Sequence, residues 1–348
     1  MRKLKVGIVG CGLISQEKHI PAYRRLKKNI EMSAICDLDL SLARRVATNE
    51  KIPSFYDTVT EMLENEELDF VDICVPPGVH EPVANQAIEH GCHVIMEKPM
   101  ALTVEDCDSI IDNARKHSTK VCMIHNNLFN PAMMKAKRMI QSGRIGDFVG
   151  MRILLSTPRW EMIDKKDHWY HKLPGGIIGE TGPHMAYMAL EFIGNIIDVD
   201  IFARSIIGLP WVPFDEFRVV IEGSEGFCST QLSYTQESRL AMIDILGTNS
   251  SLHLNLHPMV LVERKVTELT PISVNKILLN SIGQMLSDSF INFGKGILRL
   301  ESSGTERIIE GFVKSLMNDD PVPVSMENGR ETVRLMELLV NRLNEKYA

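Results

Sequence analysis

The stretch LKVGIVGCGLIS (residues 4–15) predicts the architecture of the first third of the chain. Its apolar half, Leu4 to Val9, is typical of a strand buried on both faces. Its second half follows the G-x-G-x-x-G pattern, with Ser15 at the last position. Gly10 permits a tight turn, Gly12 lets a pyrophosphate approach the backbone, and the small Ser15 allows close helix packing. The unpaired amides of the following helix start would then face the phosphates.

Glycines spaced in this way also end ordinary strands, so the context of the loop matters. A second apolar run, from Met32 to Cys36, ends in Asp37. A carboxylate at that position accepts hydrogen bonds from adenosine ribose hydroxyls and repels a ribose phosphate, which favours NAD over NADP. Asp37 could instead be a turn residue or a helix cap. Arg44 and Arg45 lie close enough downstream to keep NADP open as the alternative.

Strand and helix patterns continue to alternate as far as residue 125. We expect strands at 70–75, 94–96 and 120–125, and helices at 81–90 and from the N-cap Thr103 onwards. Such alternation predicts a doubly wound parallel sheet with right-handed crossovers. Residues 1–125 are therefore expected to form a dinucleotide-binding Rossmann domain. Because Asp37 lies further from Gly10 than the usual ~20 residues, we expect residues 19–22 to absorb the excess.

Glu97-Lys98-Pro99 directly follows the apolar run at 94–96. Proline restricts the preceding residue to extended geometry, so Lys98 should lie at the carboxyl end of that strand. Ligands bind at this edge in open parallel sheets. Lys98 is therefore either a catalytic or ligand-contacting group, or a solvated charge at a strand end.

The pattern changes after Pro131. A helix is expected at 133–142, a strand at 148–155, and a period of two between 216 and 264 indicates a mostly antiparallel sheet. Amphipathic helices are expected around 308–316 and 331–347, and residues 272–300 are ambiguous. Residues 126–348 are thus predicted to form an α+β domain for substrate binding and oligomerisation. The loop at 159–171, rich in aromatic and charged residues, suits a hydroxyl-rich ligand.

The segment Glu180-Thr181-Gly182-Pro183-His184 carries the second candidate group. Pro183 suits the first position of a new helix, with Thr181 or Gly182 as its cap. Glu180 and His184 would then lie together at the helix start, with His184 as a general base and Glu180 as the carboxylate that orients it. A metal site built from His168, His171, Glu180 and His184 is conceivable, but we favour substrate contacts and expect no metal.

Composition bounds the possible partners and location. The chain has 348 residues, a net charge of −7 and no basic cluster that would indicate a nucleic-acid partner. No apolar run approaches the about 20 residues that a membrane span needs, so no membrane partner is expected. Seven cysteines without a C-x-x-C pair favour a reducing, cytoplasmic location.

Together these motifs resemble the glucose–fructose oxidoreductase, inositol dehydrogenase and MocA family of NAD(P)-dependent oxidoreductases. The resemblance covers nearly the whole chain, and its most specific parts are Glu97-Lys98-Pro99 and the carboxylate-x-Gly-x-His element. The other matching parts are the glycine loop, residues 19–22, Pro76-Pro77 with His80, and Asn126 with Phe129 and Pro131.

The resemblance implies that Lys98, His184 and Glu180 are catalytic. Lys98 would stabilise negative charge on the substrate oxygen while His184 removes the hydroxyl proton. Glu180 stands where the family usually has aspartate, Tyr187 where many sugar-oxidising members carry a second aspartate, and Leu128 near a frequent arginine. The expected cofactor contacts are Gly10, Gly12, Leu13, Ile14, Asp37, Pro76, His80, Glu97, Lys98 and Asn126, and the expected substrate contacts are Trp160, His168, Tyr170 and Tyr187.

Three functions follow as alternatives. The first is an NAD-dependent dehydrogenase acting on a sugar, cyclic polyol or nucleotide sugar, assembled as a homodimer or homotetramer. The second is a glycoside hydrolase or lyase that uses NAD transiently. The third is a cofactor-bound sugar sensor, against which the retention of both Lys98 and His184 argues.

Overall fold

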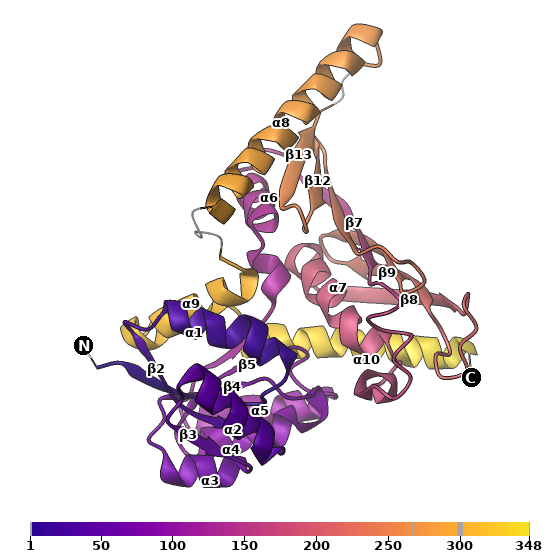
Figure 1. Cartoon of the computed structure of the whole chain (residues 1–348). Coiled ribbons are helices and arrows are strands. Elements are labelled where there is room, and N and C mark those ends of the chain that lie inside the picture. The colour runs from indigo at the N-terminus through magenta and orange to yellow at the C-terminus, as the bar shows by residue number, and fades with distance from the viewer. Residues whose placement is uncertain (1, 266–267, 298–301, 348) are drawn as a thin grey trace. The chain divides into compact units, whose positions relative to one another are not determined.

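The computed structural model describes residues 2–265, 268–297 and 302–347 (Figure 1). The chain divides into two compact units. The first comprises Met1–Asn126 and Ser303–Arg334, and the second comprises Asn127–Ser302 and Leu335–Ala348. The chain first passes from one unit to the other after Asn126, next to the predicted boundary at residue 125. The segment Ser303–Arg334, which the prediction assigned to the C-terminal domain, belongs to the first unit. In the described ranges, no helix is both long and apolar enough to cross a membrane.

The first unit is built on a six-stranded, all-parallel sheet with the strand order β3-β2-β1-β4-β5-β6. This is the predicted doubly wound arrangement. The sequence patterns did not predict β3, because a strand of three half-buried residues has no readable periodicity. The strands are β1 (Leu4–Val9), β2 (Ile30–Cys36), β3 (Ser54–Tyr56), β4 (Phe70–Ile73), β5 (His93–Met96) and β6 (Val121–Met123).

Helices connect these strands, and a further helix, α9, comes from the C-terminal part of the chain. In α9, the side chain of Phe312 packs edge-on against Phe70 of β4, with ring centroids 5.5 Å apart. This contact explains why the segment belongs to the first unit. The helices are α1 (Ile20–Arg25), α2 (Leu40–Glu50), α3 (Val59–Asn65), α4 (His80–Glu89), α5 (Val104–Lys116), α9 (Gly304–Asn318) and the short η2 (Pro77–Val79).

The helix expected after the glycine loop is divided into two parts. A π-helical turn, η1 (Ser15–His19), precedes α1. A π turn closes i→i+5 hydrogen bonds and so holds more residues per turn than an α-helix, and such turns are frequent at functional sites. It absorbs part of the long separation between the glycine loop and Asp37, and it ends on His19, which is fully buried.

The second unit contains a seven-stranded sheet with the order β13-β12-β11-β7-β10-β9-β8. Its neighbouring strands are antiparallel except for the parallel pair β7 and β10, as expected for a mostly antiparallel sheet. The strands are β7 (Phe148–Ser156), β8 (Ile196–Arg204), β9 (Glu216–Gly223), β10 (Gly226–Ser233), β11 (Leu240–Gly247), β12 (Ser251–Asn255) and β13 (Val260–Arg264).

The helices of this unit include the residues that decide its candidate site. Gly182 of α7 lies against α10, where an added Cβ would stand 2.5 Å from the Met336 side chain. Glycine therefore allows the two helices to approach closely. The elements are η3 (Asn126–Phe129), α6 (Pro131–Gln141), η4 (Trp169–Lys172), α7 (Ile178–Ile193), α8 (Pro271–Ile297) and α10 (Met326–Tyr347), whose first nine residues belong to the first unit.

Two predictions about these helices need correction or completion. The helix before His184 begins at Ile178, not at Thr181–Pro183, and Pro183 lies inside it. Because proline has no amide hydrogen, the helix continues past Pro183 without the hydrogen bond to the carbonyl of Gly179. Glu180 thus lies in the first helical turn and His184 one turn later. The ambiguous stretch 272–300 is helical as far as Ile297, within α8, and residues 298–300 lie outside the described residues.

Candidate active site

Five of the predicted residues follow strands at the carboxyl edge of the parallel sheet. Gly10 follows β1, Asp37 follows β2, Pro76 lies just beyond β4, Lys98 beyond β5 and Asn126 beyond β6. The strand order reverses between β1 and β4, and ligands of open α/β sheets bind at such a switch point. The first unit therefore brings the predicted cofactor contacts to one edge.

The glycine loop is shaped by close backbone packing on one side and open space on the other. Gly10 has φ +102°, and an added Cβ would stand 2.6 Å from the carbonyl oxygen of Cys74. An added Cβ at Gly12 would meet nothing within 4 Å. The buried Ser15 closes the loop by donating its hydroxyl to the Gly12 carbonyl at 2.9 Å. The loop thus presents an uncovered backbone at Gly12.

Asp37 fixes the other side of this loop. Its Oδ2 accepts the backbone N–H of Cys11 at 2.7 Å, and its Oδ1 accepts that of Asp39 at 3.0 Å. Asp39 in turn is the N-cap of α2, accepting the N–H groups of Ser41 and Leu42. The helix-cap role considered for Asp37 therefore belongs to Asp39. Two carboxylates at this strand end make a position that repels phosphate.

Lys98 lies half-buried just past the end of β5, and its backbone is held by the preceding residue. The Oε2 atom of Glu97 accepts the N–H of Lys98 at 3.1 Å. The other carboxylate oxygen, Oε1, lies 3.1 Å from Nε2 of His19. Glu97 was predicted to contact the cofactor. In the structure it is buried and joins the π-helical turn to the backbone at Lys98.

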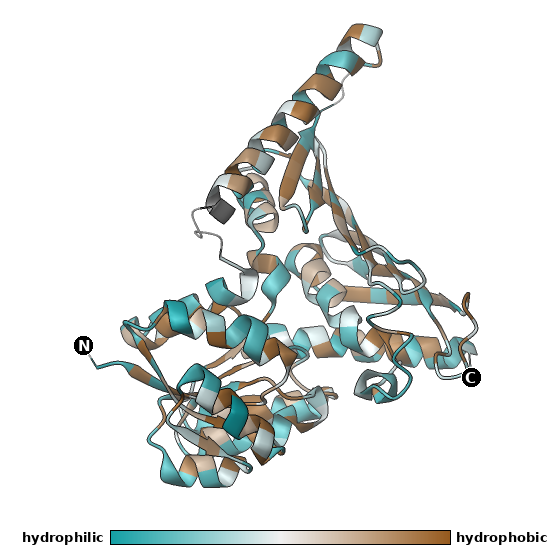
Figure 2. Cartoon of the chain, viewed as in Figure 1, coloured by the Kyte–Doolittle hydropathy of each residue, from teal (hydrophilic) through white to brown (hydrophobic). Residues whose placement is uncertain are grey.

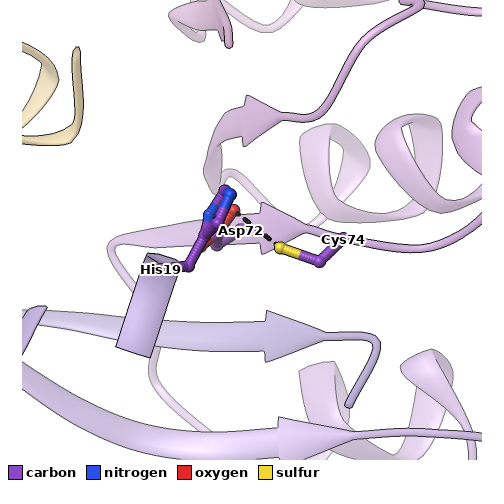
Figure 3. Close-up of side chains that lie close together, drawn as sticks. All are labelled: His19, Asp72 and Cys74. Carbon is purple, nitrogen blue, oxygen red and sulfur yellow. Dashed lines mark hydrogen bonds and ion pairs between the residues drawn. The ribbon is translucent and has the colours of Figure 1, made fainter. Parts of the chain in front are cut away.

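His19 is the centre of a buried cluster that also contains Tyr23, Asp72 and Glu97 (Figure 3 shows His19 with Asp72 and Cys74). Its Nδ1 lies 2.8 Å from Oδ2 of Asp72, and the hydroxyl of Tyr23 donates to the same oxygen at 2.9 Å. Asp72 belongs to β4, so the cluster connects three separate parts of the first unit: the turn after the glycine loop, β4 and the end of β5.

The imidazole of His19 is charged in this setting. Burial is the largest single influence and lowers the pKa of His19, but the charges and hydrogen bonds of Asp72 and Cys74 together raise the pKa well above 6.5. Burial also raises the pKa of Glu97, yet the hydrogen bond and charge of His19 bring it below its ordinary value. A buried imidazolium therefore lies between two carboxylates, and each charge compensates the desolvation of its partner.

His19, Asp72 and Cys74 also have the spacing of metal ligands, with their donor atoms within 4.8 Å of one another. The hydrogen bonds already described occupy His19 and Asp72. Burial, reinforced by Asp72, raises the pKa of Cys74 to about 12, so its sulfur is a protonated thiol that points at Asp72. We therefore interpret this group as a hydrogen-bond network. Among the described residues, His168, His171, Glu180 and His184 do not form a group with ligand spacing.

One other predicted cofactor contact, His80, has structural partners. His80 is fully buried, and its ring nitrogens lie 2.8 Å from the carbonyl oxygens of Val75 and Pro99. Burial lowers the pKa of His80, against the opposing effect of these two carbonyls. His80 therefore braces the loop after β4 against the segment after Lys98. Leu13 and Ile14, by contrast, are exposed beside the glycine loop.

In the second unit, His184 forms a hydrogen bond with Tyr187 of the same helix. Nδ1 of His184 lies 2.7 Å from the phenol oxygen of Tyr187. That oxygen also accepts the backbone N–H of Asn127 at 3.2 Å. Tyr187 is buried. It therefore enters the candidate site as a hydrogen-bond partner of the imidazole. The i, i+3 spacing of the two residues on one helix face is the sequence signal that could have indicated this pairing.

The loop at 159–171 is braced mainly by its own contacts. Tyr170 is buried, its hydroxyl lies 2.8 Å from the Met162 carbonyl, and its ring stacks on His168 with centroids 4.0 Å apart. Trp160 is exposed. Nδ1 of His168 is buried and has no hydrogen-bond partner among the described residues. Glu180 acts electrostatically on both His168 and Tyr170, so these groups lie near the start of α7.

The predicted residues thus form two groups, one in each unit. Lys98 belongs to the first unit, whereas His184, Glu180, Tyr187, His168 and Tyr170 belong to the second. The sequence interpretation missed the cluster around His19. Its one signal was Asp72, an acidic residue inside an apolar strand, which needs a buried partner.

This architecture, a Rossmann unit with a glycine loop joined to an α+β unit, is that of a two-domain dinucleotide-dependent oxidoreductase. Comparison with known proteins specifies the class. Residues 4–125 match the model of the oxidoreductase family with an NAD-binding Rossmann fold, and residues 133–253 match the GFO/IDH/MocA C-terminal domain. The chain belongs to the Gfo/Idh/MocA family of oxidoreductases.

Relatives in sequence are distant. An uncharacterised oxidoreductase of Schizosaccharomyces pombe is 26% identical, over 74% of this chain and 67% of its own length. A glycosyl hydrolase family 109 protein of Shewanella putrefaciens is also 26% identical, over 70% of this chain and 58% of its own. The chain therefore spans about three fifths to two thirds of the length of these relatives.

Solved structures agree with the fold over nearly the whole chain. The WlbA dehydrogenase from Bordetella pertussis, in complex with NADH and UDP-GlcNAcA, superposes with a TM-score of 0.81 at 18% identity and covers 99% of this chain and 96% of its own. A levoglucosan dehydrogenase, in complex with NADH and L-sorbose, superposes with a TM-score of 0.81 at 20% identity and covers 99% of this chain and 98% of its own.

The His19 cluster predicts a characteristic pH dependence of stability. A raised folded-state pKa stabilises the protein fully below the unfolded value of about 6.5, and this contribution is lost as pH rises through the folded pKa. The lowered pKa of Glu97 contributes stability above its unfolded value of about 4.3, and this contribution is lost as pH falls through the folded pKa. Between about pH 6 and about pH 9, we expect the unfolding free energy of the wild type to fall more than that of His19→Gln, measured by urea denaturation.

The matched control is His90→Gln, the same substitution at an exposed histidine of the same unit. It should keep the wild-type pH dependence and stability. His19→Gln should also lose roughly 3–5 kcal/mol near neutral pH, because it leaves two carboxylates buried without their cation. Parallel pH profiles for wild type and His19→Gln would contradict the assignment of a buried imidazolium.

Proposed function

We propose that this protein is an NAD-dependent dehydrogenase that oxidises a secondary alcohol of a polyhydroxylated substrate, a sugar, cyclic polyol or nucleotide sugar. The observation that carries the proposal is the arrangement at the sheet edge, where the glycine loop, Asp37 and Lys98 follow adjacent strands. A cytoplasmic location agrees with seven free, buried cysteines.

The residues of the first unit fit a dinucleotide. Gly10 leaves no room for a side chain, and Gly12 leaves its backbone uncovered, which together form a cradle for a pyrophosphate. Asp37 is held in place by the Cys11 amide and would accept hydrogen bonds from the ribose hydroxyls. Since Asp37 and Asp39 are both acidic and precede Arg44 and Arg45, we propose NAD over NADP.

When bound, the nicotinamide supplies the acceptor for the hydride. The chain's own residues handle the proton and the charge. We assign His184 as the base that takes the hydroxyl proton on Nε2, with its Nδ1–H donating to the phenol oxygen of Tyr187. Lys98 would hydrogen-bond the same substrate oxygen and stabilise its developing negative charge. Glu180 would bind a further substrate hydroxyl, and His168 lies near this carboxylate.

Two further considerations support a polyhydroxylated substrate. The loop at 159–171 offers aromatic rings beside polar groups, a combination that suits sugars, which have both apolar faces and hydroxyls. The structural neighbours named above were crystallised with UDP-GlcNAcA and with L-sorbose. The direct test is to incubate the protein with NAD and a panel of sugars, polyols and nucleotide sugars and to measure reduced nicotinamide.

A second function is favoured by one specific observation, the likeness to a glycosyl hydrolase family 109 protein. In that case the protein would oxidise a sugar transiently, release its aglycone and reduce the sugar again. With a chromogenic glycoside and catalytic amounts of NAD, aglycone release without accumulation of reduced nicotinamide would support the hydrolase. Stoichiometric accumulation of reduced nicotinamide supports the dehydrogenase.

Cofactor preference gives the first prediction. Asp37→Ala should bind NADH more weakly and NADPH more tightly, because the substitution removes the ribose acceptor and the charge that repels a phosphate. Fluorescence titration of both nucleotides should show the preference for NADH fall by at least about tenfold, or 1.4 kcal/mol. Asp57→Ala, at an acidic residue near the end of β3, is the control and should leave the preference unchanged. Wild-type protein that binds NADPH tenfold more tightly would contradict the assignment.

The second prediction concerns Lys98. Lys98→Ala should lower turnover of the identified substrate by roughly 100- to 1,000-fold, the loss seen when one donor to a developing oxyanion is removed. NADH affinity should stay close to that of the wild type. Lys28→Ala, an exposed lysine in the same unit, should be fully active. His184→Ala should lose at least about 100-fold, and the double variant should lose less than the product because both residues act in one step. Full activity in Lys98→Ala would refute its catalytic role.

The third prediction distinguishes two roles of Tyr187, positioning His184 or binding the substrate. Tyr187→Phe keeps the ring but removes the acceptor for Nδ1 of His184. As a positioning residue, Tyr187 should then affect kcat by about tenfold or more, shift the pH at which activity is half-maximal, and leave KM nearly unchanged. A rise in KM alone, with an unaltered pH profile, would instead make Tyr187 a substrate-binding residue.

A further inference from the structure

Helix α8 presents a polar face to its own domain and an apolar face away from it, the reverse of a surface helix. The residues on its inner side recur at helical spacing, and most of them are polar: Ser273, Ile277, Ser281, Gln284, Asp288 and Asn292. Apolar residues occupy the other side, and brown bands recur along α8 in Figure 2.

The polar face caps β13, which is the edge strand of the antiparallel sheet. The side-chain amide of Gln284 pairs with the backbone N–H and C=O of Glu263, at 2.9 and 3.1 Å. Asp288 accepts the N–H of Leu261 at 3.0 Å and forms an ion pair with Lys135. These side chains satisfy backbone groups that would otherwise be free to pair with another strand. The orientation of α8 is therefore fixed by specific hydrogen bonds.

The opposite side carries large apolar side chains along the length of the helix, which we call the α8 stripe. With 3.6 residues per turn, its members fall on one side of the helix. All are exposed, Leu279 by 68%, Phe290 by 72% and Phe293 by 69%. The stripe comprises Ile272, Val274, Leu278, Leu279, Ile282, Met285, Leu286, Phe290 and Phe293.

The area of the α8 stripe exceeds what a monomer normally exposes. Nine side chains of this size and exposure present roughly 1,000 Å² of apolar surface, whereas the largest apolar patch of a typical monomer measures about 300–600 Å². A standard protein interface buries about 800 Å² on each partner. The stripe is thus large enough to form a stable interface without other contacts.

Charge favours a protein over a membrane as the covering partner. Helices that lie on membranes carry Lys and Arg along the polar face. Between Ile272 and Phe293, the sequence has only Lys276 and Asp288 as charged residues, and Asp288 is paired with Lys135. The net charge of −7 also opposes binding to anionic lipid.

We propose that the α8 stripe binds the α8 stripe of a second copy of this chain. An apolar stripe about 32 Å long is complementary to itself when two copies lie antiparallel across a two-fold axis. Each copy then covers the other from end to end, and the capped β13 edge is left undisturbed. The contact is independent of the proposed catalytic function.

The test is the mass of the full chain in solution, by sedimentation or light scattering at about 10 µM. Leu279→Glu/Leu286→Glu brings four carboxylates into the interface, where like charges are strongly unfavourable, and should halve the mass. The matched control is Asn280→Glu/Ser287→Glu, which adds the same charge at the same spacing but one residue further around the helix. It should keep the wild-type mass. Circular dichroism checks that both variants are folded.

A second measurement does not depend on the folding of a charged variant. The seven natural cysteines are all buried, so Leu286→Cys introduces an accessible thiol only where the stripe is uncovered. Its reaction with a maleimide should be at least tenfold faster at about 10 nM protein than at about 10 µM, after correction for concentration. Equal rates would overturn the proposal.

Three further results would also overturn the proposal. They are a monomeric wild type at 10 µM, a stripe variant with unchanged mass, and loss of association in the control. A separate arm uses vesicles of phosphatidylcholine and phosphatidylglycerol in equal parts. Co-flotation of the wild type that is lost in Leu279→Glu/Leu286→Glu would show that the stripe binds lipid instead of a second copy.

Discussion

The first unit depends on a buried imidazolium held between two carboxylates. His19, Asp72 and Glu97 come from the turn after the glycine loop, from β4 and from the end of β5. None of these charges is stable in the interior alone, because desolvation of a single ion costs several kcal/mol. Once paired, they hold the three segments in one arrangement. The π-helical turn after the glycine loop and the backbone of Lys98 are therefore coupled through Glu97, which contacts His19 and the amide of Lys98.

The second unit uses packing to achieve a similar result at α7. Gly182 allows α7 to lie against Met336 of α10, and the close approach fixes the helix on which Glu180 and His184 stand. Tyr187 then holds the imidazole through a hydrogen bond, one helical turn further on. In each unit a buried neighbour hydrogen-bonds the principal candidate residue: Glu97 binds the backbone amide of Lys98, and Tyr187 binds the imidazole of His184.

Helix α8 shows how the same physics can leave a surface uncovered. An edge strand must be protected, and Gln284 and Asp288 protect β13 with side-chain hydrogen bonds. The polar residues needed for that task occupy the inner face of the helix, so the apolar residues lie outside. The protection of an edge and the exposure of an apolar stripe are consequences of one choice of helix orientation.

Local patterns in the sequence determined most of the fold. Apolar runs and glycine spacing predicted β1, the turn at Gly10 and the position of Asp37, because these depend only on neighbouring residues. The proline after Lys98 likewise indicated that the lysine follows a strand. The family was also recognisable from these motifs, in particular from Glu97-Lys98-Pro99.

Only the tertiary structure decided which distant residues meet. His19 is 53 residues from Asp72 and 78 from Glu97, and no local pattern reports such pairs. The start of α7 was misjudged because Pro183 is a helix-start signal, whereas the helix begins at Ile178 and contains the proline. The unit to which α9 belongs and the orientation of α8 were undetermined for the same reason. An amphipathic pattern defines a helix and its faces, but the element that each face contacts is decided by the rest of the folded chain.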